Sequence, residues 1–244
     1  TSDEFAGINA DEIEDPRPWC EIIRQWSTLH PEFAFLPRKF KIAVTGAKTD
    51  RAAIQVHDIG LQVLKNADNE VGFKVLVGGG LGRSPAIGVA IKDFLPAKHL
   101  LTYLEAILRV YNRYGRRDNK YKARIKILVK AWTAEVFADK VEQEWLQEID
   151  SPSTLTDEVI AHAKAFFETI DGESSESKLQ SLAAEQVAFG KWRDRNVIGH
   201  KVPGYCAVHL SLKPTGVAPG DVTDSQLEAI ADLADRYSFS EVRV

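Results

Sequence analysis

Residues 51–80 read RAAIQVHDIGLQVLKNADNEVGFKVLVGGG, which is two apolar stretches separated by a polar turn. The first stretch, 51–64, and the second, 73–80, are rich in the β-branched and aliphatic residues typical of strands. The segment NADNEVG between them supplies the Asn, Asp and Gly residues that favour a turn. Strand, turn and strand in this order predict a hairpin, so we expect an antiparallel or mixed sheet.

The stretch before this hairpin, LPRKFKIAVTG at 36–46, predicts a further strand with a positively charged start. Arg38, Lys39 and Lys41 directly precede the apolar run at 42–44. On a strand, Lys39 and Lys41 point to the same face, where two ammonium groups repel each other unless an anion lies between them. Two interpretations stay open: the lysines bind a small oxyanion or a carboxylated ligand, or both side chains simply reach water.

Helices are predicted on both sides of these strands, because apolar residues recur there at helical spacing. Thr133 is the predicted N-cap of the helix that follows it. The predicted helices cover residues 16–30, 97–115, 119–132, 133–149 and 156–170. We therefore expect residues 1–170 to form an α/β lobe with a mixed sheet flanked by helices.

The C-terminal part of the chain is predicted to be separate from this lobe. The segment DGESSES is acidic and Ser-rich, and we interpret 171–199 as a linker and a helix. Residues 200–244 show a strand–loop–helix–strand pattern, with Thr223 and Gln226 as a capping box. This pattern is half of a ferredoxin-like unit, so the predicted fold class of the whole chain is α+β. The stripe expected to be buried on its helix is Leu227, Ile230, Leu233 and Ala234.

Composition and charge exclude several classes of function. The 244 residues are 44% apolar and 27% charged with a net charge of −4, so no basic field attracts nucleic acid or a membrane surface. No apolar run approaches the ~18 residues of a membrane span. Cys20 and Cys206 lie far apart and cannot supply the four thiolates of an iron–sulfur cluster, and the histidines show no metal-ligand spacing. We expect no metal site in these residues, and a reduced, cytoplasmic protein.

The glycine-rich segment VLVGGGLGRSP does not fit a dinucleotide-binding fingerprint. Gly78 and Gly80 match its first and third glycines, but the sixth position is Arg83, and Ser84-Pro85 prevents an immediate helix. A strand that ends in Gly78, Gly79 and Gly80 allows a bulky ligand to approach the backbone, and Arg83 can hold an anionic group of that ligand. The alternative is a glycine-rich turn without a ligand.

A second basic segment, RRDNKYKARIK at 116–126, follows the helix predicted at 97–115. Lys122 and Lys126 are four residues apart and would share one helix face, with Arg124 off that row. This segment is interpreted either as a solvated helix surface or as a clamp for the carboxylates of a polyanionic cofactor.

These segments together resemble the siroheme-dependent sulfite and nitrite reductases. The matching motifs occur in family order from about residue 10 to 223: LPRKFKIAVTG, HDIGL, GFKVLVGGGLGRSP, RVYNRYG, RRDNKYKARIK and PGYCAVHLSLKPTGVAPGDVT. The resemblance implies a six-electron reduction of sulfite or nitrite at a siroheme bridged to a 4Fe–4S cluster through a shared cysteine. It also implies a ferredoxin or a flavoprotein as electron donor.

The resemblance assigns roles to individual residues. Lys39 and Lys41 resemble the lysine pair that binds the substrate oxyanion and helps to supply protons, and Arg38 lies in the same motif. The segment Gly78-Gly79-Gly80 with Arg83 resembles the part that lies against the macrocycle. The residues that resemble those contacting siroheme carboxylates are Lys122, Arg124 and Lys126.

The cysteines that bind the cluster belong to a second half of the family's enzymes, which these residues do not contain. The sequence also has no methionine, and we interpret it as an internal part of a longer chain. By itself it is expected to bind neither siroheme nor a cluster and to be inactive. A different class remains as an alternative: a non-catalytic module that binds an anion or a tetrapyrrole. The motifs do not distinguish sulfite from nitrite.

Overall fold

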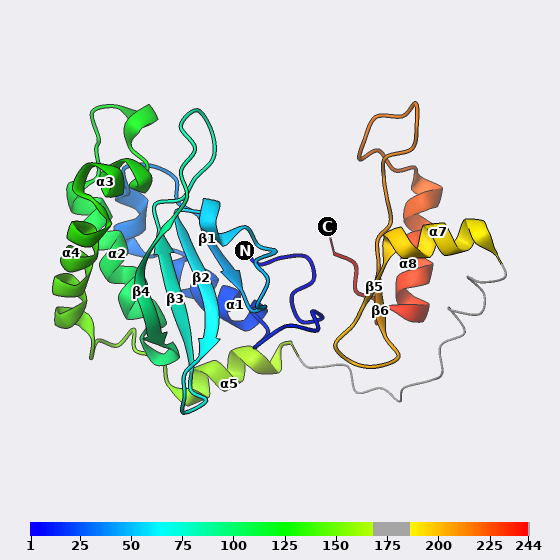
Figure 1. The fold of residues 1–244 in the computed structure, drawn as a ribbon, viewed down its shortest axis with the longest axis horizontal. Coiled ribbons are helices and arrows are strands. Elements are labelled where there is room, and N and C mark those ends of the chain that lie inside the picture. The colour runs from blue at the N-terminus through cyan, green and yellow to red at the C-terminus, as the bar shows by residue number, and fades with distance from the viewer. Residues whose placement is uncertain (168–185, 244) are drawn as a thin grey trace. The chain divides into compact units, whose positions relative to one another are not determined.

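The computed structural model describes residues 1–167 and 186–243. The chain divides into two compact units, Thr1–Asp171 and Gly172–Val244, each with its own secondary structure (Figure 1). The predicted acidic linker at 171–177 lies outside the described residues. Among the helices that are described, none is long and apolar enough to cross a membrane.

The first unit is built on a mixed sheet with the strand order β1-β2-β3-β4. Strand β1 (Ile42–Thr45) pairs in parallel with β2 (Ile59–Lys65), and β2 pairs with β3 (Val71–Val77) as an antiparallel hairpin. The mixed sheet and the hairpin confirm the prediction. The strand predicted over 51–64 is too long, because Ile54–Val56 form a 3₁₀ turn and β2 begins only at Ile59.

Strand β4 (Val89–Pro96) completes the sheet and was not predicted. Its sequence VAIKDFLP carries Lys92 and Asp93 in the middle and ends in proline, so it lacks the apolar character of the inner strands. An edge strand tolerates charges and a terminal proline because one side of its backbone needs no partner strand. Its place at the edge of the sheet explains why the apolar pattern did not indicate it.

One face of the sheet carries the core. Phe73, Val75 and Val77 of β3 are fully buried, whereas the alternating Lys74 and Leu76 on the opposite face are half-buried. Helices α2 (Leu100–Tyr114), α3 (Ile125–Trp132) and α4 (Ala134–Glu148) lie together beside the sheet (Figure 1). From α1 (Arg17–Ser27), the buried Trp19 meets the Phe73 ring edge-on at 5.2 Å between ring centroids.

The N-terminal segment bonds the free side of β1 through Thr1, and residues 11–14 bond the chain that directly follows β1. The Val44 N–H donates to the Thr1 carbonyl at 2.8 Å, and the Ile13 N–H donates to the Gly46 carbonyl at 2.7 Å. Further along, the Lys48 N–H donates to the Asp11 carbonyl at 3.2 Å. The N-terminal segment therefore covers backbone groups that β1 would otherwise present to solvent.

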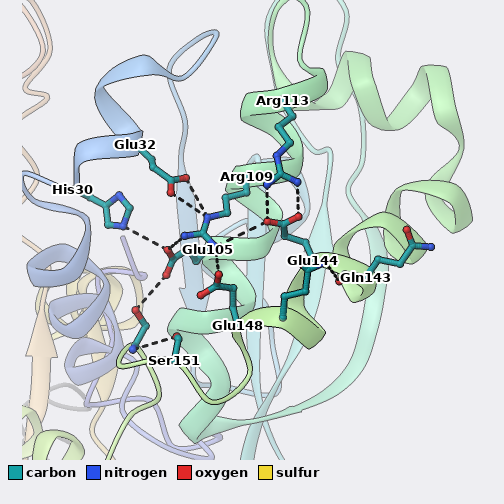
Figure 2. Close-up of polar contacts among 11 residues, drawn as sticks. His30, Glu32, Glu105, Arg109, Arg113, Gln143, Glu144, Glu148 and Ser151 are labelled. Atoms are coloured by element: carbon teal, nitrogen blue, oxygen red, sulfur yellow. Dashed lines mark hydrogen bonds and ion pairs between the residues drawn. The ribbon is translucent and has the colours of Figure 1, made fainter.

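Arg109 of α2 stands at the centre of a group of acidic side chains, which we call the Arg109 cluster (Figure 2). Its guanidinium contacts Glu32 at 3.1 Å and Glu105 at 2.8 Å, and it pairs with Glu148. Glu144, 4.0 Å from Arg109, is also held by Arg113 at 2.6 Å. These contacts join α2 to α4 and to η1 (Pro31–Phe35), the 3₁₀ turn that directly precedes the basic segment at 36–41.

Two features of the predicted helices are wrong. The helix predicted at 119–132 begins only at Ile125, because Arg124 has an extended backbone and η4 (Lys120–Lys122) is a separate 3₁₀ turn. Lys122 and Lys126 therefore do not share a helix face. Thr133 stands at the N-cap position of α4 but makes no capping hydrogen bond. Its hydroxyl instead bonds the Glu135 carboxylate, which lowers the pKa of Glu135.

Helix α5 (Asp157–Ala165) matches the predicted helix and is capped by the Thr156 side chain. In the second unit, α7 (Val187–Asn196) leads into β5 (Val197–Gly199), which pairs with β6 (Cys206–Val208) as an antiparallel hairpin. Helix α8 (Asp224–Tyr237) has the predicted capping box of Thr223 and Gln226.

Two details of the prediction for the second unit are wrong. The strand expected after α8 is not formed in the described residues up to Arg243. The expected buried stripe is largely open: Leu227 is 57% and Leu233 51% exposed, and only Ala234 is buried. With no strand formed after α8 in the described residues, the unit offers no completed sheet for this stripe to cover.

Candidate functional site

Three segments meet at one end of the strands of the mixed sheet, which we call the site edge. The start of β1 lies beside the start of β2 because these strands are parallel, and the end of β3 lies there because β3 is antiparallel to β2. The backbone N–H of Lys41 donates to Asp58 Oδ2 at 3.0 Å, and the backbone N–H of Gly78 donates to the Asp58 carbonyl at 3.0 Å. The lysine and glycine segments singled out in the sequence are therefore neighbours, joined through Asp58.

Asp58 also brings in the second basic segment. Its carboxylate is fully buried and accepts two hydrogen bonds from the Arg124 guanidinium, Nε to Oδ1 and Nη2 to Oδ2, both at 2.8 Å. Such a two-bonded pair fixes the orientation of both groups. Sequence reasoning missed Asp58. The available signal was a single carboxylate directly before a buried strand in HDIGL, a position where an unpaired charge would be costly.

Tyr111 of α2 provides a second connection between the same segments. Its hydroxyl donates to the carbonyl of Ala123 at 2.8 Å and lies 3.5 Å from the carbonyl of Arg38. The Phe40 ring stacks on the Tyr111 ring with 6.4 Å between centroids. Burial, and then the nearby Asp58 carboxylate, raises the pKa of Tyr111 from 10.0 to about 12.

This shift in the Tyr111 pKa predicts an alkaline loss of stability. The folded state holds the proton more tightly, so the stabilisation is fully present below pH 10 and is lost as pH rises through about 12. Tyr111→Phe should lower the free energy of unfolding by about 1 kcal/mol at neutral pH and weaken its decline above pH 10. Urea unfolding at several pH values measures both effects, with exposed Tyr121→Phe as the control. An equally steep alkaline decline in Tyr111→Phe would contradict the assignment.

The three glycines at the end of β3 are required by packing within the chain. Gly78 has a φ of +89°, a conformation that side-chain-bearing residues rarely adopt. A Cβ at Gly79 would lie 2.3 Å from the Gln55 carbonyl oxygen and 2.5 Å from that of His57. A Cβ at Gly80 would lie 3.2 Å from the Arg124 guanidinium. At Gly79 the group that approaches closely is the backbone before β2, and the approach of a ligand to these glycines stays a prediction.

Gly79→Ala is therefore expected to destabilise the chain in the absence of any ligand. The added methyl group collides with two backbone carbonyls that cannot rotate away, a form of overpacking that typically costs about 1–3 kcal/mol. Denaturant unfolding of the cofactor-free chain measures this cost. Gly199→Ala is the control, because nothing lies within 4 Å of a Cβ at that position. Equal stability of the two variants would show that contact with the Gln55 and His57 carbonyls does not require glycine at position 79.

The cations of the site edge fall into two groups. Arg124 is bound to Asp58, and the Lys126 ammonium donates to the carbonyls of Leu81, at 3.2 Å, and Ser84. Burial, and then the neighbouring Arg124 charge, lowers the pKa of Lys126. Within the described part of the chain, the structure records no hydrogen bond or ion pair for five other cationic side chains: Arg38, Lys39, Lys41, Arg83 and Lys122.

Arg38 and Lys39 also line a cavity of about 780 Å³ that opens beside the site edge. Trp26, Phe33 and Phe40 contribute aromatic walls to it. Lys39 and Lys41 are both exposed and precede β1, which begins at Ile42. Lys41 is not among the residues that line the cavity, and its backbone N–H bonds Asp58. The prediction that Lys39 and Lys41 point to the same face of a strand is therefore wrong, because both precede β1 and only Lys39 lines the cavity.

The unpaired cations suit an anionic group with several carboxylates, because each can form a charge-assisted hydrogen bond without breaking an existing ion pair. The described residues contain no group of three or more His, Cys, Asp and Glu side chains that could hold a metal ion. Cys20 and Cys206 are single thiols in different units. The chain's own residues therefore fit an anionic cofactor or substrate, and they do not form a cluster site.

The sequence of residues 1–149 matches the family described as the nitrite and sulphite reductase 4Fe-4S domain. The match covers more than half of the chain, and the chain belongs to this family of siroheme sulfite and nitrite reductases. The motif-based resemblance is thereby confirmed.

The chain is also similar to individual sulfite and nitrite reductases and to one solved structure. The chain is 35% identical to sulfite reductase (ferredoxin) 1 of Mycolicibacterium paratuberculosis, over 98% of this chain and 36% of that protein. It is 28% identical to the assimilatory ferredoxin-dependent nitrite reductase of Haloferax mediterranei, over 98% and 38% respectively. The fold is similar to that of the NirA protein of Mycobacterium tuberculosis, with a TM-score of 0.55, 22% identity, and coverage of 97% and 43%. The chain thus spans little more than a third of the length of these curated relatives.

Proposed function

We propose that this chain forms the anion-binding part of a siroheme-dependent reductase that converts sulfite to sulfide or nitrite to ammonia with six electrons. The observation that carries the proposal is the group of five unpaired cations around the junction of Lys41, Asp58 and Gly78. A bound anion would compensate the positive charge of these side chains, and the net charge of −4 shows that they do not belong to a generally basic surface. Sulfite, nitrite and siroheme carboxylates are all anions.

In this proposal Lys39 and Lys41 hold the substrate. Each ammonium donates hydrogen bonds to an anion oxygen, and each can pass a proton to an oxygen that leaves as water. When bound, siroheme with its 4Fe–4S cluster supplies the iron that receives the anion and the path for electrons. Arg38, Arg83 and Lys122 are proposed to bind carboxylates of the cofactor, and the glycine end of β3 to shape the surface beside it.

The cluster and the electron donor involve groups beyond these residues. Four thiolates are needed for a 4Fe–4S cluster, and this chain has two cysteines. We propose that the cluster ligands come from outside these 244 residues, and that the chain alone is inactive. Relatives named as ferredoxin-dependent enzymes favour ferredoxin over a flavoprotein as the donor.

The proposal is tested on the full-length protein that contains this chain. Purified protein should show the visible bands of siroheme and should form sulfide from sulfite or ammonia from nitrite with reduced ferredoxin. Comparing the two anions at equal concentration identifies the preferred substrate. A protein that binds a tetrapyrrole but turns over neither anion would support the non-catalytic binding module instead. A protein that binds neither a tetrapyrrole nor the anions and turns over neither anion would exclude both.

A further inference from the structure

Asp58 is the point at which the three segments of the candidate site are tied together. Its carboxylate accepts the Lys41 backbone N–H at 3.0 Å and two guanidinium N–H groups of Arg124 at 2.8 Å. Its own carbonyl accepts the Gly78 N–H at 3.0 Å. The Asp58 side chain is 0% and the Arg124 side chain 18% exposed. The buried carboxylate thus holds the start of β1 and the turn before α3, and the backbone carbonyl of the same residue holds the end of β3.

Stability alone is a weak explanation for this arrangement. A buried ion pair commonly adds little net stability compared with apolar residues of similar size, because both charges must be removed from water. What such a pair does supply is one defined geometry, since the guanidinium fork accepts a carboxylate in few orientations. Here the defined geometry is that of the backbone from which the Lys41 side chain projects.

The ion pair of Asp58 and Arg124 also gives Arg124 and Lys41 different roles. The Nε and Nη2 groups of Arg124 are occupied by Asp58, so these groups are not free to bind an anionic ligand. Lys41 differs from Arg124 in this respect. Its backbone N–H is bound to Asp58, but its ammonium group has no recorded partner in the described residues. Arg124 thus neutralises Asp58, which would otherwise place a negative charge directly beside the lysine segment.

We propose that Asp58 and Arg124 form a positioning pair that fixes the backbone of Lys41 and so aims the Lys41 ammonium at the bound anion. This inference rests on the proposed function. It assigns Arg124 to the interior of the site, where it acts through Asp58 and does not itself contact the cofactor. Misplacing a binding group by about 1 Å can cost on the order of 10²-fold in rate.

Two single variants separate positioning from a simple charge effect. Arg124→Gln makes the site more negative, and Asp58→Asn makes it more positive. If the pair acted only through its charge, the first variant would weaken anion binding and the second would strengthen it. If the pair positions Lys41, both variants weaken binding, because each removes the two-bonded contact.

The experiment titrates sulfite into the full-length enzyme and follows the visible bands of siroheme, so that the dissociation constant refers only to cofactor-loaded protein. Both variants are expected to raise that constant by about tenfold to 10²-fold. In the 244-residue chain, amide hydrogen exchange should show lower protection at Lys41 in both variants. If Arg124→Gln fails to fold, Arg124→Lys carries the test, because it keeps the charge and loses the fork.

Asp11 and Arg51 provide a matched control. Asp11 also accepts a guanidinium, from Arg51 at 2.8 Å, and a backbone N–H, from Thr49 at 3.0 Å, but this pair lies past the other end of β1. Arg51→Gln should leave sulfite affinity unchanged. Opposite effects of the two test variants, or unchanged affinity in both, would overturn the positioning role. If Lys41→Ala and Lys39→Ala also leave sulfite affinity and turnover unchanged, the proposed function fails together with this inference. If the lysine variants do lower them, only the positioning role of Asp58 and Arg124 fails.

Discussion

Replacing Lys41 by alanine in the full-length enzyme is expected to lower anion turnover by about 10²–10³-fold, and Lys39→Ala should have an effect of the same order. The reason is that the negative charge on the substrate oxygens grows as electrons arrive, so a donor placed there stabilises the transition state more than the bound anion. Both side chains are exposed and are recorded without a partner in the described residues, so neither change removes an internal contact.

The measurement is steady-state turnover of sulfite and nitrite per bound siroheme. Lys48→Ala is the matched control, because Lys48 is an exposed lysine just beyond the opposite end of β1. Siroheme content and unfolding midpoint should be the same in all three variants. If the Lys39 and Lys41 variants turned over the anion as fast as the Lys48 variant, these lysines would be ordinary solvated side chains at the start of a strand.

Arg109→Met is expected to produce the largest loss of stability in the chain, about 3–5 kcal/mol in the free energy of unfolding. Methionine retains the aliphatic stem but leaves the carboxylates of the Arg109 cluster without their shared cation (Figure 2). Glu105 is only 8% exposed, so water cannot fully replace its lost partner, whereas Glu144 keeps its ion pair with Arg113. The loss is comparable to much of the total stability of a typical domain.

Denaturant unfolding of the 244-residue chain measures this loss. Arg116→Leu is the control, since Arg116 pairs with Asp118 on the surface and its removal should hardly move the midpoint. Arg109→Met combined with Glu105→Leu should recover part of the loss, because one uncompensated carboxylate is removed with its partner. A midpoint for Arg109→Met equal to that of the control would show that the cluster is solvated in solution.

The inner strands and the long helices could be predicted from the sequence because their own residues carry the pattern. Strand β3 alternates buried and half-buried side chains, and α2 buries a broad apolar face, so local periodicity matched the final environment. Strands β4 and β5 carry no such pattern, whereas β6 is the first strand of the pattern predicted for residues 200–244. The strand conformation of β4 and β5 comes from pairing with a neighbour, which no single segment reveals.

The candidate site, too, could be predicted from the sequence only where the signal is local. The lysine and glycine segments were recognisable because charges before a strand and glycines after one are unusual within a few residues. Asp58 was not, because its importance comes from three partners, of which Arg124 is 66 positions away in the sequence. The proposed helical row of Lys122 and Lys126 failed for the same reason, since the bond of Arg124 to Asp58 holds the backbone extended just before α3.

The N-terminal segment along β1 has a consequence for how this protein can be handled. Strand β1 lies at one end of the strand order, and Thr1 bonds the side of its backbone that faces away from β2, while residues 11–13 bond the chain just beyond β1. Without that segment, an apolar strand with open N–H and C=O groups would be offered to any other chain in extended conformation. A shortened chain that begins after residue 14 would therefore be expected to aggregate through the uncovered side of β1. In the longer chain, the N-terminal residues prevent this pairing.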